Sequence, residues 1–168
     1  MEDEITQTLP DDYFMQAALR EAQKAYINQD VPIGAVVVRG DTIIGRGYNM
    51  IEKIQDATAH AEIIAIGAAA QKAGSWRLHE CTLFITLEPC LMCTGAILQS
   101  RVNRVVFGAS DSRFGAITTH SHKDEAEEAY KRWPEITEGV LKDECRALIQ
   151  TFFREIRKKA KEKRNDAE

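Results

Sequence analysis

The sequence predicts an α/β fold, a layered sandwich with a mixed sheet, formed by a single domain over residues 1–168. A length of 168 residues is that of one ordinary domain, and the composition, 44% apolar and 29% charged, is that of a globular protein. A hairpin pattern early in the chain is followed by strand-like runs that alternate with helix-like runs. This order of elements is typical of helices packed on a mixed sheet.

The first elements are a helix, a hairpin of two strands and a second helix, predicted over residues 13–28, 33–38, 42–48 and about 60–72. Apolar residues at helical spacing predict the first helix, with Asp11 and Asp12 as candidates for its N-terminal cap. Two β-rich runs predict the hairpin because Gly40-Asp41, a favoured turn sequence, lies between them. The alanine-rich second helix is predicted to end near Gly74.

The later elements alternate between strand and helix, and they are predicted over residues 83–86, 91–100, 104–107, around 125–131, near 136 and from about 142 onward. Short β-rich runs predict the strands, and Pro89 precedes the helix over 91–100. The pattern is weakest through residues 112–134, where only the short helix is predicted.

Several function classes are excluded by composition. No apolar run reaches the roughly 18 residues that a membrane span needs, and the longest runs, 31–38 and 63–70, are less than half of that. The first four residues are acidic, whereas a secretory signal begins basic and then turns apolar. Four cysteines in an intracellular chain indicate thiols or metal ligands rather than a disulfide framework. We therefore predict a cytoplasmic protein with no membrane partner.

Basic residues gather near the C-terminus of a chain whose formal net charge is −4. Residues 154–164 hold seven basic and two acidic residues, which gives this segment +5 and leaves −9 for the remainder. Four of the basic residues follow helical spacing on one face, and they are Arg154, Arg157, Lys158 and Lys161. This basic stripe predicts a local phosphate contact. The alternative is a solvated helix end, where cations are favoured in any case. The apolar residues at positions 141, 145, 148, 152 and 156 are predicted to face the core.

The residues that indicate chemistry are a His-Ala-Glu tripeptide at 60–62 and a Pro-Cys-Leu-Met-Cys sequence at 89–93. Two cysteines three positions apart at a helix start can turn both sulfurs toward one ion, and a histidine from elsewhere can supply a third ligand. Three protein ligands leave a tetrahedral zinc ion one open position, which is the mark of a catalytic site. We therefore predict one Zn²⁺ per chain, held by His60, Cys90 and Cys93.

Glu62 lies two residues from His60, and in a regular helix such neighbours do not share a face. An unligated carboxylate beside a zinc-bound water is a proton shuttle, which is the role predicted for Glu62. On its own, the Cys-x-x-Cys pair would equally indicate a structural clip or a redox pair. A fourth ligand would make the site structural, and the candidates are Cys81, Cys145, His79, His120 and His122. Cys81 and Cys145 lie in apolar patterns and are predicted to be core thiols.

His-x-Glu followed by Pro-Cys-x-x-Cys is the signature of the zinc nucleobase deaminases. The sequence resembles the bacterial tRNA adenosine deaminases of the cytidine/deoxycytidylate deaminase superfamily beyond this motif. The blocks that carry the resemblance are DVPIGAV at 30–36, TAHAE at 58–62, TLEPC at 86–90, SRV at 100–102, VFGA at 106–109 and FFR at 152–154. The resemblance covers roughly residues 12–115 and resumes from about 136 to 154.

The resemblance implies a three-layer α/β/α sandwich with a five-stranded mixed sheet, a homodimer, and hydrolysis of the wobble adenosine of a tRNA anticodon to inosine. It implies that His60, Cys90 and Cys93 are the zinc ligands and that Glu62 is the proton shuttle. Asn49 is implied to hydrogen-bond the flipped base or its ribose, and Ala61 to lie against the substrate. With the tRNA anticodon arm as partner, the residues predicted to contact RNA are Phe152, Phe153, Arg154, Arg157, Lys158 and Lys161.

The sequence departs from the family after Phe114-Gly115. A Ser-Leu-containing helix and an Asn-His-Arg turn are replaced by residues 116–125, with acidic residues through Glu128. In the family this region borders the RNA groove. Two other functions therefore stay open: deamination of a free base, nucleoside or nucleotide of guanine, cytosine or cytidine type, and a non-catalytic zinc-stabilised RNA-binding module. Glu62 argues against the module because a structural site has no use for that carboxylate, and the basic stripe argues mildly against a free base.

Overall fold

The computed structural model describes residues 9–165 of the chain. Its helices are α1 (Asp11–Ile27), α2 (Ile51–Ile54), α3 (Ala61–Ala73), α4 (Leu91–Ser100), α5 (Lys123–Tyr130) and α6 (Lys142–Asn165). Its strands are β1 (Gly34–Arg39), β2 (Thr42–Tyr48), β3 (Cys81–Leu87), β4 (Arg104–Ala109) and β5 (Glu135–Glu138). The acidic residues 1–4, on which the prediction of no secretory signal rests, lie outside the described residues. Every helix within 9–165 is too short or too polar to cross a membrane.

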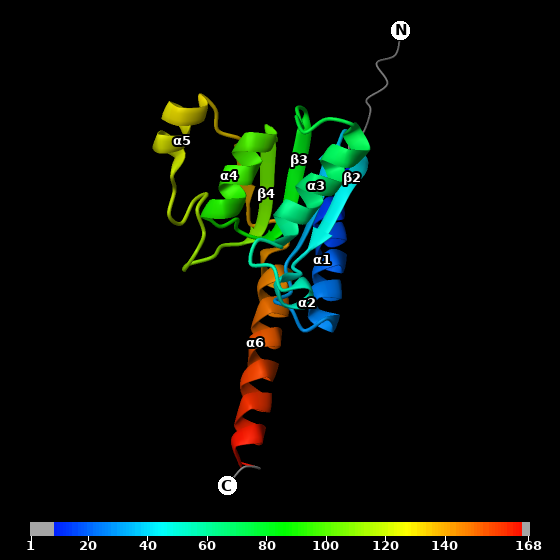
Figure 1. The fold of residues 1–168 in the computed structure, drawn as a ribbon, viewed down its shortest axis with the longest axis vertical. Coiled ribbons are helices and arrows are strands. Elements are labelled where there is room, and N and C mark those ends of the chain that lie inside the picture. Colours follow the sequence, from blue (N-terminus) through cyan, green and yellow to red (C-terminus); the bar gives the residue numbers. More distant parts are fainter. Residues whose placement is uncertain (1–8, 166–168) are drawn as a thin grey trace.

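The strands form one mixed sheet in the order β2-β1-β3-β4-β5 (Figure 1). Strand β1 pairs antiparallel with both β2 and β3. Strands β3, β4 and β5 run parallel to one another. Parallel neighbours need a crossover connection, and α4 supplies the one between β3 and β4. The five-stranded mixed sheet is confirmed.

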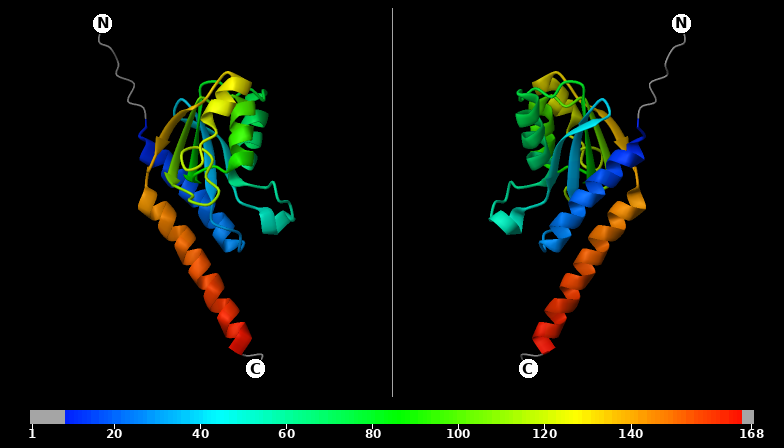
Figure 2. Two further views of the ribbon diagram at one scale, coloured as in Figure 1. Left: turned by 90° about the vertical axis from the view of Figure 1, so that its left-hand side faces the viewer. Right: turned by 90° about the vertical axis from the view of Figure 1, so that its right-hand side faces the viewer.

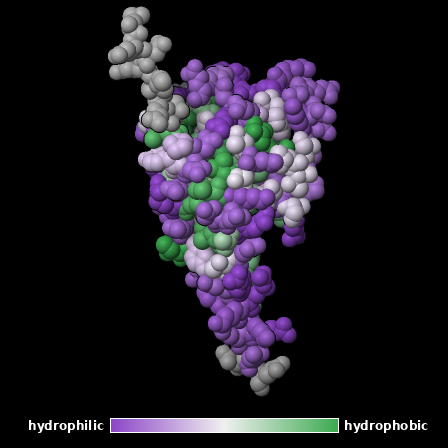
Figure 3. Space-filling view, turned by 180° about the vertical axis from the view of Figure 1, so that it is seen from behind, coloured by the Kyte–Doolittle hydropathy of each residue, from purple (hydrophilic) through white to green (hydrophobic). Residues whose placement is uncertain are grey.

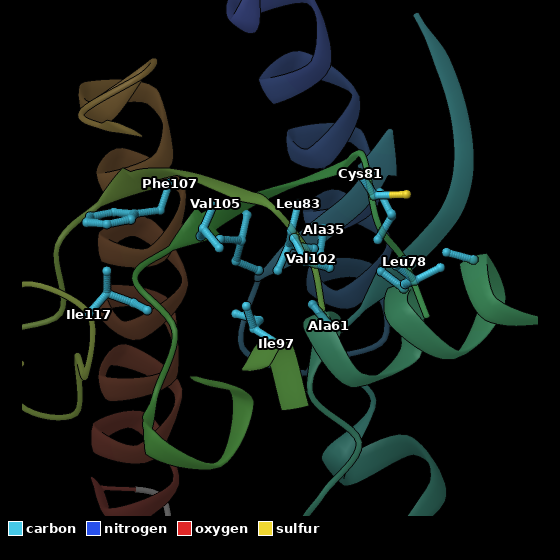
Figure 4. Close-up of a cluster of buried hydrophobic side chains, with 14 residues drawn as sticks. Ala35, Ala61, Leu78, Cys81, Leu83, Ile97, Val102, Val105, Phe107 and Ile117 are labelled. Carbon is cyan, nitrogen blue, oxygen red and sulfur yellow. The ribbon is translucent and has the colours of Figure 1, made fainter. Parts of the chain in front are cut away.

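Helices cover both faces of this sheet, α3 and α4 on one side and α1 and α6 on the other (Figure 2). Successive strand residues point to opposite faces, so Val105 packs with α3 and α4 whereas Val106 packs with α1. Figure 4 shows the first of these two cores, in which Ala61 of α3 and Ile97 of α4 face strand side chains such as Leu83. The predicted three-layer α/β/α sandwich is therefore confirmed.

The start of α1 differs from its prediction. Pro10 is the N-cap, so Asp11 and Asp12 lie in the first turn and neither is the cap residue. Asp11 instead forms an ion pair with Arg104 of β4, with 2.6 Å between Oδ2 and the guanidinium nitrogen. The aspartate therefore ties α1 to the sheet.

Helix α2 is absent from the sequence prediction because four residues are too few to show a helical period. Its N-terminus is held by Asp30, which is buried. The Asp30 carboxylate accepts the backbone N–H groups of Glu52 at 2.8 Å and Lys53 at 3.1 Å. This contact orders the segment between β2 and α3. The end of β2 and the start of α3 both lie at the functional site described below.

Helix α6 starts on the sheet and then leaves the body of the molecule, so its second half stands alone (Figure 1). Phe152 is the last buried residue of the helix, at 5% exposure, and it packs against Tyr26 of α1. Ile156 is 44% exposed, so the prediction that it faces the core is wrong. Figure 3 shows the projecting end of α6 as almost entirely hydrophilic, as its basic sequence requires.

Candidate metal centre and active site

The starts of α3 and α4 bring the predicted metal ligands together. His60 is the N-cap residue of α3, and Cys90 is the N-cap residue of α4. Cys93 lies in the first turn of α4 and is fully buried. A helix N-terminus carries a partial positive charge, so the positions of Cys90 and Cys93 favour the thiolate form of each side chain.

The three donor atoms have the separations of a tetrahedral site. The Nδ1 atom of His60 lies 3.7 Å from the sulfur of Cys90 and 3.5 Å from that of Cys93. Zinc–nitrogen and zinc–sulfur bonds of ordinary length at a tetrahedral angle place nitrogen and sulfur about 3.6 Å apart. All three ligand atoms lie within 4.8 Å of one another. The residues therefore fit one zinc ion per chain.

The group within residues 9–165 has three members, with no fourth cysteine or histidine beside it. Two of the alternative ligands named from the sequence, Cys81 and Cys145, are buried in the hydrophobic cores, as predicted. Burial raises the pKa of Cys145 to about 12, which keeps it a neutral thiol. An open fourth position is the arrangement of a catalytic zinc site.

The pKa values of the two cysteine thiols shift in opposite directions. A hydrogen bond from Cys93 lowers the pKa of the Cys90 thiol to about 4. The same hydrogen bond, together with burial, raises the pKa of Cys93 above its usual range. The pKa of His60 is raised chiefly by its hydrogen bond with Cys90. A thiolate in this position is ready to bind a cation.

Glu62 lies in the first turn of α3, outside the donor group. Its side chain is only 4% exposed, and it lines the cavity beside His60 and Cys90. Burial is the main cause that raises the pKa of Glu62 to about 7. A carboxyl group with such a pKa can take up and release protons near neutral pH, as general acid–base catalysis requires.

The metal group opens into a cavity of about 700 Å³, a volume usual for small-molecule sites. The cavity is lined by Val31, Ile33, Asn49, Ile51, His60, Ala61, Glu62, Leu87, Glu88, Cys90, Ser110, Asp111, Ser112, Arg113, Phe114, Ile149 and Phe153. Most of these side chains are apolar or present an apolar face. The polar lining residues outside the donor group are Asn49, Glu62, Glu88 and the four residues 110–113. A cavity with apolar walls and several hydrogen-bonding groups can hold and orient one ring.

Asn49 follows β2 and is buried in the wall of this cavity. Its backbone N–H donates to the carbonyl of Ile33 at 3.0 Å, and its Nδ2 donates to the carbonyl of Val31 at 3.3 Å. Its Oδ1 atom is buried and has no hydrogen-bond partner. A buried acceptor without a partner costs free energy, so this oxygen fits a donor on a bound molecule.

The structure separates the residues predicted to contact RNA. Phe153 lies on the rim of the cavity, whereas Phe152 is buried against α1 and offers little surface to RNA. Arg154 and Arg157 line a second, shallow cleft that is open to solvent along one face of α6, together with Phe153. The two clefts are adjacent because they share Ile149 and Phe153. Lys158 and Lys161 lie farther along the exposed end of α6.

Sequence reasoning missed the segment from Ser110 to Phe114, which forms one wall of the cavity. It also missed Glu88, which is buried. Burial acts to raise the pKa of the Glu88 carboxyl, but the hydrogen bonds from Thr119 and its neighbours outweigh burial, so the pKa lies below its usual value. The sequence TLEPC at 86–90 could have indicated Glu88, because it places a carboxylate between a buried strand and a metal ligand. The irregular segment gives no periodic signal at all.

Comparisons with known proteins agree with this geometry. Residues 9–109 match the family described as the cytidine and deoxycytidylate deaminase zinc-binding region. The chain belongs to this deaminase family. The tRNA-specific adenosine deaminase of Bacillus subtilis (strain 168) is 44% identical over 156 residues, which are 93% of this chain and 96% of that relative. The tRNA-specific adenosine deaminase of Streptococcus pyogenes serotype M1 is 42% identical over 149 residues, 89% of this chain and 86% of that relative.

Solved structures of the deaminase family share the fold. One comes from studies of A-to-I editing by tRNA:A34 deaminases at the wobble position of transfer RNA, and it aligns with a TM-score of 0.76 and 36% identity. The alignment covers 81% of this chain and 98% of that one. A guanine deaminase from Bacillus subtilis aligns with a TM-score of 0.57 and 33% identity, over 73% of this chain and 71% of its own. The resemblance to the deaminases is thus confirmed, and the matched family region contains the whole donor group.

Proposed function

We propose that this deaminase hydrolyses adenosine to inosine at the wobble position of a tRNA anticodon. The observation that carries the proposal is the three-donor group with the unligated, buried Glu62 beside it in a cavity large enough for one base. The relatives at 42–44% identity are named tRNA-specific adenosine deaminases, which supports adenosine in tRNA over other members of the family.

In this proposal His60, Cys90 and Cys93 hold the zinc ion. Bound there, zinc would act as a Lewis acid that activates a water molecule as a nucleophile near neutral pH. The nucleophilic oxygen adds to C6 of adenine. Glu62 takes the proton of the water and delivers it to N1 of the base. It then carries the proton of the new C6 hydroxyl to the exocyclic amine. The C6–N6 bond breaks, ammonia leaves and the C6 carbonyl of inosine forms.

Two other residues of the cavity orient the base. The unpaired Oδ1 of Asn49 accepts a hydrogen bond from the base or from the ribose hydroxyl. Ala61 is the first residue of α3 and lines the cavity with a side chain that leaves room for a flat ring. Both assignments need the base to be turned out of its stack, which is how enzymes reach a reactive atom of a nucleic-acid base.

The second cleft gives the proposed path for the rest of the anticodon arm. Phe153 lies between the two clefts, where its ring can stack on a nucleotide beside the target. Arg154 and Arg157 can then meet phosphates, followed by Lys158 and Lys161 along α6.

A tRNA substrate is in keeping with the predicted cytoplasmic location. The predicted homodimer stays a prediction, for which the exposed Leu91 and Met92 of α4 are candidate interface residues.

A free base is the second candidate substrate. The similarity to a guanine deaminase and a cavity that holds one base favour it. The basic, projecting end of α6 favours RNA, since a free base has no phosphates to bind. A non-catalytic zinc module is disfavoured because it would need neither the open ligand position nor Glu62.

The test offers the purified, zinc-loaded protein four substrates at equal concentration: an anticodon stem-loop with adenosine at the wobble position, free adenosine, cytidine and guanine. Ammonia release and the inosine content of the RNA are measured. We expect turnover of the stem-loop at a kcat/KM far above that of the small substrates. Turnover of guanine or cytidine with none of the stem-loop would replace this proposal by the free-base function.

A further inference from the structure

Glu88 is a second buried carboxylate beside the metal ligands, and none of the roles assigned above uses it. It follows Leu87 at the end of β3 and precedes Pro89. Its side chain is 2% exposed. Burying a carboxylate is costly unless hydrogen-bond donors surround it. The donors around Glu88 therefore indicate what this residue holds in place.

Six donors from one loop converge on the Glu88 carboxylate. The backbone N–H groups of Ile117, Thr118 and Thr119 donate to Oε1 at 3.2, 2.8 and 2.9 Å. The backbone N–H of Asp111 donates to Oε2 at 3.1 Å. The hydroxyl groups complete the set. Thr119 donates to Oε2 at 2.6 Å, and the Thr118 hydroxyl lies 3.3 Å from Oε1 of Glu88 and 3.2 Å from Oε2 of Glu138, so that its one proton is shared between the two carboxylates. One side chain thus joins two separate parts of the loop.

We name residues 110–119 the pocket-wall loop. Its first half, from Ser110 to Phe114, lines the cavity, and Phe114 is 59% exposed. Its second half contains the first residues at which the chain departs from the tRNA deaminase pattern, 116–119. The backbone also ties the loop to the metal-ligand turn, since the N–H of Ala116 donates to the carbonyl of Pro89 at 2.9 Å. Glu88 therefore lies where the ligand turn and the pocket wall meet.

Gly115 shows how closely the loop fits this carboxylate. A Cβ atom at Gly115 would collide with Oε2 of Glu88 and would lie 2.6 Å from the carbonyl oxygen of Asp111. Any side chain larger than hydrogen would therefore push the loop away from Glu88. A surface loop that was free to shift would not need such a close approach.

We propose that Glu88 is a positioning residue that fixes the pocket-wall loop against the metal-ligand turn and thereby sets the affinity of the cavity for the substrate base. The residue acts through the loop and takes no part in proton transfer. Its kinetic consequences rest on the proposed function, whereas its effect on the loop rests on the contacts alone.

The variant Glu88→Gln separates the two halves of this network. The amide oxygen can replace Oε1 and keep the three N–H donors of residues 117–119. The amide NH₂ group then faces the N–H of Asp111, which sets a donor against a donor. The reverse orientation leaves three donors without an acceptor and is worse. We therefore expect the first half of the loop to loosen while the second half stays bound.

Two measurements follow the loop and the substrate separately. Amide hydrogen exchange at residues 110–114 is expected to be at least about tenfold faster in Glu88→Gln, because local opening becomes easier. Zinc content per chain is expected to stay unchanged. With the anticodon stem-loop as substrate, KM is expected to rise roughly tenfold with kcat little changed, since a wall that contacts the base before and during reaction contributes uniform binding.

Glu21→Gln is the matched control. Glu21 is also a buried carboxylate, but it pairs with Lys24 and Arg46 and does not line the cavity. Its replacement is expected to lower the melting temperature while leaving both the exchange of the pocket-wall loop and KM as in the wild type.

Unchanged loop exchange together with an unchanged KM in Glu88→Gln overturns the proposal. Loss of zinc or of kcat at an unchanged KM also overturns it, because Glu88 would then act through the metal turn. If Glu88→Gln does not fold, Gly115→Ala displaces the loop from the opposite side and must give faster exchange and a higher KM. Hydrogen exchange needs no substrate, so it decides the role of Glu88 in the loop even if the stem-loop is not deaminated by the wild type.

Discussion

His60 and Glu62 lie two positions apart at the start of α3, and this spacing gives them different roles. His60 turns its Nδ1 toward the two cysteine sulfurs, whereas Glu62 is buried in the cavity wall outside the donor group. We expect Glu62→Ala to retain zinc, because it removes no ligand, and to lower kcat by about 10²–10⁴, because it removes the proton path. Elemental analysis and an inosine assay check the two parts.

The control for Glu62→Ala is Cys90→Ser. This variant is expected to lose zinc and stability together, since metal binding and folding are coupled. Loss of zinc from Glu62→Ala as well would mean that the carboxylate is a ligand, and the proton-shuttle role would then be withdrawn.

Asn49 is the other residue at which a single atom decides the role. Its Nδ2 and backbone N–H hold the cavity wall together, and its Oδ1 is left unpaired. Asn49→Ala is expected to keep zinc and fold while lowering kcat/KM by roughly tenfold, the factor expected when one buried hydrogen-bond partner is removed. Steady-state kinetics and a thermal melt distinguish the roles: a lower melting temperature with unchanged kinetics would make Asn49 a purely structural residue.

Among the elements, α3 depends on a glycine in the sheet for its position. A Cβ atom at Gly47 of β2 would collide with the carbonyl oxygen of Ala61 and lie 2.6 Å from the nitrogen of Ala65. Because His60 is the N-cap of α3 and Glu62 lies in its first turn, pushing α3 off the sheet also moves the metal site. Gly47→Ala is expected to reduce the free energy of unfolding by about 1–3 kcal/mol, as overpacking does, and to weaken zinc binding. Denaturant unfolding and competition with a chelator measure the two effects.

Gly67 supplies the control within the same helix. It is exposed on α3, and a Cβ atom there would meet nothing within 4 Å outside the helix backbone. Gly67→Ala is therefore expected to stabilise the protein by up to about 1 kcal/mol, because alanine loses less entropy than glycine on entering a helix. Equal destabilisation by both substitutions would show that the close approach at Gly47 is unimportant.

The elements differ in how well the sequence predicts them, for physical reasons. Helix α4 has the predicted bounds because a proline precedes it and apolar residues repeat through its whole length. Helix α2 is too short to show a period. The prediction that Ile156 faces the core is wrong because a helical pattern gives the face on which a residue lies, but not the residue at which the helix leaves the body of the molecule. The metal ligands were predictable from local spacing, whereas Glu88 and the pocket-wall loop reach the site through irregular backbone.

Basic residues are concentrated at 154–164, on the end of α6 that projects from the body of the molecule (Figure 1). Residues 9–153 carry a net charge of −4 against +5 for residues 154–164, so the body is mildly acidic, whereas the end of α6 attracts a nucleic-acid backbone. The second cleft joins this helix to the cavity. The charge distribution therefore favours a substrate that reaches from the metal site along α6.

The last prediction tests that division of charge with two double variants of equal net charge. Arg154→Gln with Arg157→Gln removes two charges from the basic stripe at the second cleft. Lys159→Gln with Lys163→Gln removes two charges from the opposite side of α6, since these positions lie roughly half a helical turn away. If the stripe binds phosphates, only the first double variant raises KM for the anticodon stem-loop. In that variant the slope of the logarithm of the RNA-binding constant against the logarithm of the salt concentration becomes shallower by about 0.7 for each phosphate that is no longer neutralised. Zinc content and melting temperature are expected to stay constant in both, because all four side chains are exposed. Equal salt slopes in the two double variants would reduce the stripe to a solvated helix end, and equal turnover of free adenosine and the stem-loop would then favour the small substrate.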